Sequence, residues 1–190
     1  MIPIIDTGHG YNTPGKRSDG FYHPNGKVIL KENSVNEAVG NKLSMLFWLN
    51  GCESHFITNE WWDVPLEERC KRESKIAREI KQRGEKSVFI SIHADAFHKK
   101  NAARGGRFFY KSESGRKIAE ALTRYLRTNG YGLGLREPMQ KNFKVLRDTS
   151  SPAVLFEMGF MTTKSDLDVM LLDSFRNKTA KLLYDGINTL

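Results

Sequence analysis

Three apolar segments of the sequence each lead into a side chain that can bind a metal ion or move a proton. These side chains are His9, His93 and Glu157. Imidazole nitrogens and carboxylate oxygens are typical ligands of catalytic zinc, which commonly has three protein ligands and a fourth position for water. A carboxylate beside such a site can accept a proton from water and return it to a leaving amine. The pattern therefore indicates a metal-dependent hydrolase, in which Glu157 serves either as base or as ligand.

The competing interpretation is that these are ordinary polar residues at strand ends. They lack the fixed local spacing of a His-Glu-x-x-His motif, and three ligands plus a separate base require one more carboxylate. Against this, two histidines and a glutamate occupy equivalent positions after apolar segments. His23, His55 and His98 are not expected to be ligands; His55 falls within a predicted strand, and His98 adjoins two lysines in a predicted loop.

Apolar segments alternate with helical patterns along the whole sequence, which predicts an α/β domain with a mostly parallel sheet. Strands are expected at residues 2–5, 53–58, 88–92, 106–110 and 153–156. Helices are expected at 34–50, 65–83, 114–128, from 165 onward, and at 174–187, with a hairpin turn at 24–26. A capping box formed by Ser34 and Glu37 is predicted to open the first helix. Parallel neighbouring strands would bring the three polar side chains to one edge of the sheet.

Composition and charge limit the possible functions. The 190 residues are 39% hydrophobic and 27% charged, which is the balance of a globular protein of about one domain. No segment has the roughly 20 apolar residues that a membrane span requires, and the first residues do not resemble a secretory signal. The net charge of +8 favours a polyanionic partner, which includes nucleic acid, anionic lipid and anionic cell-wall polymer.

The candidate residues also carry a resemblance to a known family. The segments 6–10 (DTGHG), 91–95 (SIHAD) and 157–160 (EMGF) resemble, in this order, the signatures of zinc-dependent N-acetylmuramoyl-L-alanine amidases of the amidase-3 type. This group includes cell-division, sporulation and phage-lysin amidases. The resemblance spans nearly the whole chain, from Ile4 to the final helix. It implies one α/β catalytic domain over residues 1–190, with a twisted, mostly parallel sheet of about six strands flanked by helices and no separate wall-binding domain.

The resemblance also supplies the missing carboxylate. The family's glutamate ligand precedes the first long helix, in a stretch that resembles residues 32–36 (ENSVN), and this selects Glu32 over Glu37. The resemblance therefore implies one zinc ion per chain, held by His9, Glu32 and His93, with Glu157 as the catalytic carboxylate.

The implied reaction is hydrolysis of the amide bond between N-acetylmuramic acid and L-alanine in peptidoglycan, as performed by endolysins and autolysins. The implied partner is the anionic cell wall; we expect no specific nucleic acid partner, no membrane span and a monomer. Because the sequence shows no signal peptide, we expect synthesis in the cytoplasm and action on the wall after lysis or holin-type release.

Two other functions are alternatives. The first is a zinc carboxypeptidase, or another peptidoglycan peptide hydrolase, on the same scaffold. The second is a basic module that binds the wall or nucleic acid without catalysis. The lysines and arginines are dispersed along the chain and form no stripe, which disfavours nucleic acid binding.

The sequence departs from the family pattern around the implied site. Tyr11 stands where a second glycine is usual, and Asn59 stands where arginine is typical. The segment between His9 and Glu32 is longer than in many members. These departures leave the implied ligands and base intact and affect the expected details of substrate binding.

Several neighbouring residues have two interpretations. Asp6 and Asp95 either orient the ligand histidines or cap turns. Trp61 and Trp62 are expected to pack in the core or against a loop, in preference to stacking on sugars. Arginines able to contact acidic groups of the substrate are Arg104, Arg107 and Arg147, for which solvated surface charge is the simpler interpretation.

Overall fold

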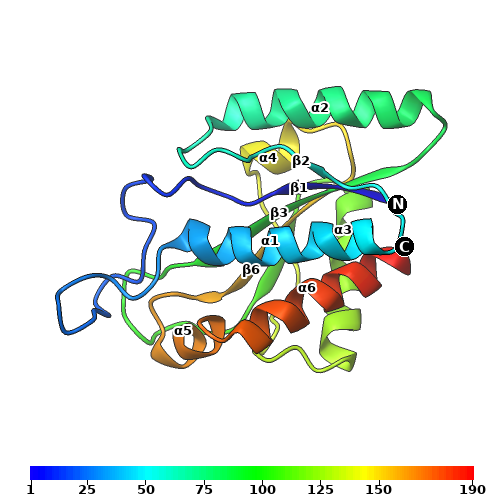
Figure 1. Cartoon of the computed structure of the whole chain (residues 1–190). Coiled ribbons are helices and arrows are strands. Elements are labelled where there is room, and N and C mark those ends of the chain that lie inside the picture. The colour runs from blue at the N-terminus through cyan, green and yellow to red at the C-terminus, as the bar shows by residue number, and fades with distance from the viewer.

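The computed structural model describes residues 1–190 and consists of a central sheet covered by helices on both faces (Figure 1). The sheet has six strands in the order β2-β1-β3-β6-β4-β5. Their bounds are β1 Ile2–Asp6, β2 His55–Phe56, β3 Ser87–Asp95, β4 Arg107–Tyr110, β5 Met139–Gln140 and β6 Ala153–Phe160. Strands β2, β1, β3 and β6 pair in parallel, and β4 runs antiparallel to β6. The predicted α/β class and mostly parallel sheet are confirmed.

Six helices cover the two faces of the sheet. Their bounds are α1 Glu32–Leu49, α2 Leu66–Gln82, α3 Glu113–Thr128, α4 Lys144–Arg147, α5 Lys164–Met170 and α6 Asp173–Asn188. Helices α2 and α4 lie on one side of the sheet, while α1, α5 and α6 lie on the other (Figure 1). Two apolar clusters follow the same division, one built with side chains of α2 and α4 and the other with side chains of α1, α3, α5 and α6.

Alternation along the strands explains why both clusters exist. In β1, Ile4 packs in the cluster with α2, and the next residue, Ile5, packs in the cluster with α1. In β3, Phe89 and Ile90 divide in the same way. Successive side chains of a strand point to opposite faces, so strands buried on both faces are mostly apolar. This is why the segments before the candidate residues are apolar, with the buried Ser91 of β3 as the exception.

The predicted elements agree with the structure except at several boundaries. Helices α2, α3 and α6 begin and end within about two residues of the expected positions, and α5 begins one residue before the expected start at 165. Helix α4 and the two-residue β5 were not predicted. The predicted hairpin is present as a bridge between Tyr22 and Val28, and Gly26 adopts a positive φ of 77° in its turn. Glycine has no Cβ and adopts this conformation readily.

The predicted capping box at the start of α1 is wrong. The helix begins at Glu32, and its N-cap is Lys31, whose side chain makes no capping hydrogen bond. Ser34 lies inside the first turn, where its hydroxyl donates to the carbonyl oxygen of Lys31. Glu37 accepts a hydrogen bond from the side chain of Asn33, 3.3 Å away. The helix therefore starts two residues earlier than predicted, and this earlier start places Glu32 in its first turn.

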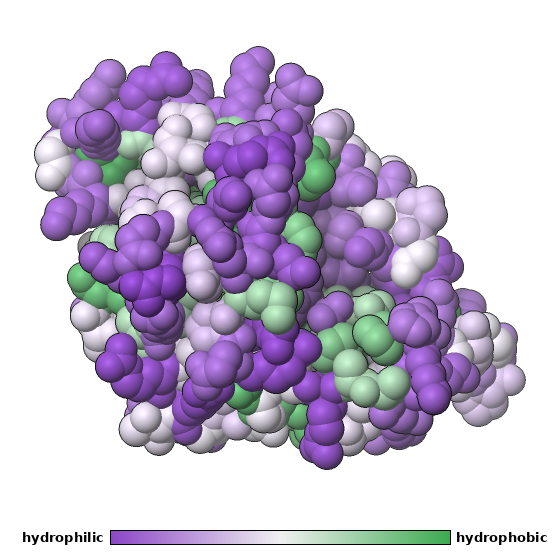
Figure 2. Space-filling model, turned by 180° about the vertical axis from the view of Figure 1, so that it is seen from behind, coloured by the Kyte–Doolittle hydropathy of each residue, from purple (hydrophilic) through white to green (hydrophobic).

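None of the helices is long and apolar enough to cross a membrane. The face shown in Figure 2 is mainly hydrophilic, with smaller hydrophobic areas between the polar side chains.

Candidate active site

His93 and Glu157 are neighbours across two central strands. They are register partners in the parallel pair β3 and β6, and the register shifts between His93 and Asp95. Both residues therefore lie inside their strands, whereas we predicted them just after the strand ends. The difference arises because β3 and β6 continue to pair beyond their apolar segments. Register partners on parallel strands project to the same side of the sheet, so this pairing brings the imidazole and the carboxyl group together.

A tight turn after β1 places His9 against His93. Gly8 and His9 both have positive φ angles, 31° and 58°. A Cβ atom on Gly8 would lie 2.3 Å from Cε1 of His93, so only glycine allows the two segments to approach this closely. The two imidazole rings have their centroids 5.0 Å apart at an interplanar angle of 87°. A positive φ at a residue other than glycine is uncommon, and such conformations concentrate at functional sites.

Glu32 joins the two histidines from the first turn of α1. Its side chain is 2% exposed, and Oε1 lies 2.9 Å from Nδ1 of His93 and 3.5 Å from Nε2 of His9. Oε1 also accepts a hydrogen bond from the backbone N–H of Ala94 at 3.3 Å. Lys16, from the loop before α1, places Nζ 3.8 Å from Oε2. The structure therefore brings together the three residues that were predicted as metal ligands.

The donor set of His9, Glu32 and His93 fits a zinc ion. One ligand atom from each residue lies within 4.8 Å of the others. Burial lowers the pKa of His9 to about 4, which leaves its imidazole neutral near pH 7, as a metal ligand must be. Burial raises the pKa of Glu32, but its hydrogen bond to His93 and the nearby positive groups outweigh burial and hold the pKa below its usual value. Two imidazoles and one carboxylate form a typical catalytic zinc site.

Glu157 is the buried acid beside this donor set. Its Oε2 atom is buried and has no hydrogen-bond partner. Burial raises the pKa of Glu157 to about 8, with the negative charges of Glu32 and Asp95 adding to the effect and His93 opposing it. Leaving a buried polar atom without a partner costs roughly 1–3 kcal/mol. Such an atom beside a metal-competent cluster is placed to exchange protons with a substrate or with water.

Burial and hydrogen bonding act in opposite directions on His93. Burial lowers its pKa, but the hydrogen bond to Glu32 and the charges of Glu32 and Glu157 outweigh burial and hold the pKa above its usual value. Without a cation, His93 and Glu32 thus stabilise each other as an ion pair. A metal ion held by Nδ1 would take the place of the proton of this pair, so metal binding would release a proton.

A buried chain of hydrogen bonds supports His93 from behind. Nε2 of His93 lies 3.1 Å from Oγ of Ser91, and Ser91 donates its hydroxyl to Oδ2 of Asp6 at 2.5 Å. Because the Ser91 hydroxyl proton is directed to Asp6, Oγ accepts the N–H of the imidazole, which leaves Nδ1 toward Glu32 for a metal ion. Arg69 in turn donates from Nη1 to Oδ1 of Asp6 at 2.9 Å. Asp6 therefore acts on His93 through Ser91, whereas Asp95 accepts from the N–H of Ala96 and stabilises a turn.

Replacing Ser91 with alanine is expected to weaken zinc binding about 10- to 100-fold, because partners that orient ligand histidines typically contribute this much. The measurement is zinc affinity by competition with a chromophoric chelator. Ser87→Ala is the matched control, since Ser87 lies in the same strand and its hydroxyl contacts Ser151 at 2.7 Å instead of a histidine. Equal affinities of the Ser91 variant and the unaltered protein would contradict this role.

Four residues around the site were not among the candidates predicted from the sequence, namely Lys16, Arg69, Ser91 and Arg136. The sequence does contain a signal for Arg69, because its spacing from Glu73, Ala77 and Ile80 places it on the same face of α2. This face is buried in the structure, and Arg69 is 2% exposed. Lys16 lies in a long loop, and no local pattern indicates its contact with Glu32.

The three candidate substrate-binding arginines have different environments, and Arg104 is exposed. Arg107 is the register partner of Glu157 on β4 and has a buried Nε atom without a hydrogen-bond partner. Arg136 places Nη2 3.8 Å from Asp95, and burial followed by the charge of Arg107 lowers its pKa. Arg147 is engaged with Asp148 at 2.7 Å in α4. Arg107 thus lies beside Glu157 in register and Arg136 lies close enough to both residues to feel their charges, while Arg147 is paired with Asp148.

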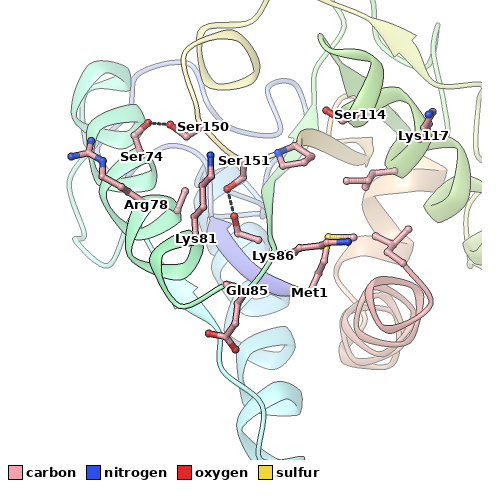
Figure 3. A pocket seen from close by; sticks show the side chains of 16 residues that line it. Met1, Ser74, Arg78, Lys81, Glu85, Lys86, Ser114, Lys117, Ser150 and Ser151 are labelled. Carbon is pink, nitrogen blue, oxygen red and sulfur yellow. Dashed lines mark hydrogen bonds between the residues drawn. The ribbon is translucent and has the colours of Figure 1, made fainter.

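A cavity of about 830 Å³ lies away from these residues (Figure 3). It opens at the edge where the parallel strands begin, next to Ser87 at the start of β3 and Pro152 just before β6. Among the residues that line it, hydrogen bonds join Ser74 to Ser150 and Ser87 to Ser151, and Figure 3 marks these bonds. None of the ligand residues or Glu157 lines this cavity, so it is not part of the candidate active site.

Comparison with known proteins finds a matching family and curated relatives. A family model described as N-acetylmuramoyl-L-alanine amidase matches residues 4–189. The probable cell wall amidase LytH of Staphylococcus aureus is 27% identical over 185 residues, which cover 97% of this chain and 56% of LytH. The chain thus spans about half the length of this curated relative.

Solved structures of similar fold include two amidases. The catalytic domain of CwlV, an N-acetylmuramoyl-L-alanine amidase from Bacillus (Paenibacillus) polymyxa, has a TM-score of 0.78 at 24% identity, covering 99% of this chain and 96% of that one. An N-acetylmuramoyl-L-alanine amidase from Clostridium difficile 630 has a TM-score of 0.80 at 21% identity, covering 99% and 95%. At these identities the likeness establishes a shared fold.

Proposed function

The chain belongs to the amidase-3 family of N-acetylmuramoyl-L-alanine amidases, and we propose that it hydrolyses the amide bond between N-acetylmuramic acid and L-alanine in peptidoglycan. The observation that supports this proposal is the convergence of His9, Glu32 and His93 beside the buried acid Glu157. This arrangement contains a metal-competent donor set and a separate proton carrier, which together suffice for metal-assisted amide hydrolysis.

In this proposal, His9, Glu32 and His93 hold one zinc ion per chain. Bound zinc supplies a Lewis acid that lowers the pKa of water and polarises the amide carbonyl. Lys16, 3.8 Å from the free oxygen of Glu32, helps to keep that carboxyl group ionised. Ser91 and Asp6 keep His93 in the orientation that presents Nδ1.

Glu157 is proposed to move the proton. Its carboxylate accepts a proton from the attacking water while the water oxygen bonds to the lactyl carbonyl carbon. It then delivers this proton to the nitrogen of L-alanine as the carbon–nitrogen bond breaks. The high pKa that burial gives Glu157 suits the second step, because a protonated carboxyl group must be present to donate. A bound cation would lower this pKa and favour the ionised form for the first step.

Product analysis tests the reaction. Incubation of purified peptidoglycan with the protein and zinc is expected to expose new amino-terminal L-alanine without new reducing sugars. Amino-terminal labelling, a reducing-sugar assay and mass spectrometry of the soluble products measure these outcomes. A carboxypeptidase on the same scaffold would release carboxyl-terminal residues and expose no amino-terminal L-alanine. Release of reducing sugars, or the absence of new amino-terminal L-alanine, would refute the amidase proposal.

The approach to the wall, the domain organisation and the oligomeric state are also proposals. The net charge of +8 supports electrostatic approach to an anionic wall, an attraction that salt should weaken. We propose that residues 1–190 act as one catalytic domain and as a monomer, which light scattering can test. Delivery to the wall after lysis or by holin-type release stays a prediction.

A further inference from the structure

Two adjacent tryptophans are exposed beside the turn that carries His9. Trp61 and Trp62 have 64% and 48% of their surface exposed, and their rings meet edge to face with centroids 6.4 Å apart. These exposures contradict packing in the core, which is one of the two roles expected for the pair, and packing against a loop stays a prediction. Large aromatic side chains that stay in water next to a functional site commonly mark a binding surface.

The segment that carries the tryptophans is fastened to the His9 turn by its backbone. Tyr11 donates its N–H to the carbonyl oxygen of Trp61 at 2.7 Å. A Cβ atom on Gly10 would lie 2.1 Å from the carbonyl carbon of Trp62, so the two backbones touch at the residue directly after His9. Asp63 donates its N–H to Oδ1 of Asn12 at 2.9 Å. The tryptophan pair and His9 therefore keep a fixed spacing.

The same segment is also tied to the support behind His93. Arg69 donates from Nη2 to Asp63 at 2.7 Å and from Nη1 to Asp6 at 2.9 Å, and its side chain is 2% exposed. Arg69 thus joins the end of the tryptophan segment to the chain of hydrogen bonds that orients His93. A surface held this rigidly loses little conformational entropy when a ligand binds.

We propose that Trp61 and Trp62 form a carbohydrate subsite that binds a pyranose ring of the glycan strand next to the scissile amide. This inference rests on the proposed amidase function, in which the sugar is attached on the carbonyl side of the bond to be cut. A sugar must then lie close to the ligand histidines, and the tryptophan pair adjoins one of them. Flat indole faces bury the apolar C–H face of a pyranose, and the exposed Asn12, Asn59 and Asp63 nearby offer polar groups for its hydroxyl and acetamido groups.

Binding of a peptide-free sugar tests the subsite without catalysis. The probe is chitotetraose, a tetramer of N-acetylglucosamine, titrated calorimetrically into the zinc-loaded Glu157→Gln protein. The double variant Trp61→Ala/Trp62→Ala in this background is expected to bind at least about tenfold more weakly, because exposed aromatic anchors carry much of such binding. Trp48→Ala is the matched control, since Trp48 is 73% exposed on α1. Unchanged affinity in the double variant, or an equal loss in the control, would overturn the proposal.

Fluorescence provides a test that does not depend on the folding of the alanine variants. The chain has three tryptophans, so the tryptophan emission of the Trp48→Phe protein, excited selectively over tyrosine, comes only from Trp61 and Trp62. Chitotetraose is expected to shift this emission and to protect it from quenching by acrylamide. Absence of both changes at millimolar sugar would overturn the subsite.

Kinetics on whole peptidoglycan separate the subsite from the amidase function. Trp61→Ala and Trp62→Ala should raise KM about tenfold with a much smaller change in kcat, and phenylalanine at either position should restore part of the loss. If the protein binds sugar through the tryptophans but cleaves no muramoyl amide, the subsite proposal stands and the amidase proposal is rejected. Normal cleavage with unaltered KM in both alanine variants would reject the subsite alone.

Discussion

Replacing Glu157 with glutamine is expected to lower kcat on peptidoglycan about 100- to 10,000-fold, which is the typical contribution of a positioned acid–base group. Glutamine has nearly the same shape but neither accepts nor donates a carboxyl proton. Because Glu157 is not in the group of converging ligand atoms, the variant should still bind close to one zinc ion per chain. Release of amino-terminal L-alanine and metal content by atomic spectroscopy are the two measurements.

Glu120→Gln is the matched control for this substitution. Glu120 is an exposed carboxylate on α3 that pairs with Arg116, and its loss should leave kcat unchanged. A Glu157→Gln protein with full activity would remove Glu157 from the mechanism. A variant that loses its zinc as well would show instead that the carboxyl group serves as a ligand, which is the other role that its position after an apolar segment allows.

Replacing Glu32 with glutamine is expected to weaken zinc binding more than about 100-fold, since even the partners of ligands change affinity 10- to 100-fold. A neutral amide is a poor zinc ligand, and the substitution removes the negative charge of the carboxylate that lies next to both His9 and His93. Zinc content after dialysis against a weak chelator should fall well below one ion per chain, and hydrolysis should fall with it.

Glu37→Gln is the control for Glu32, because Glu37 lies in the same helix and its side chain accepts a hydrogen bond from Asn33 instead of a histidine. Its zinc content and activity should match those of the unaltered protein. Circular dichroism should confirm that both variants are folded. Full zinc occupancy in the Glu32 variant would contradict the ligand assignment and would direct attention to another carboxylate.

The sequence predicted the fold through patterns that are local in the chain. The segments 2–5, 88–92 and 153–156 are apolar except for Ser91, because helices cover both faces of the strands they form. Helix α2 was located to within one residue at each end because it has clear start and stop signals, Pro65 before it and Gly84 after it. The start of α1 was misplaced because Ser34 and Glu37 match a capping box, while the structure places Glu32 at the helix start beside His93.

The candidate site was predicted in part for the same reason. His9, His93 and Glu157 were recognised because each follows an apolar segment, and such segments form neighbouring strands in this fold. Glu32 has no comparable local signal, and only the family resemblance indicated it. Its role depends on a contact between the first turn of α1 and a residue 61 positions away in the chain.

The sequence by itself thus determined the α/β class, the central strands and three of the four residues of the candidate site. Only the tertiary structure decided that His93 and Glu157 are register partners, that Ser91 links His93 to Asp6, and that Trp61 and Trp62 remain in solvent. Hydrophobic periodicity records which face of an element is buried. Strand register and hydrogen bonds between distant segments depend on how complete elements pack, and no local pattern in the chain specifies them.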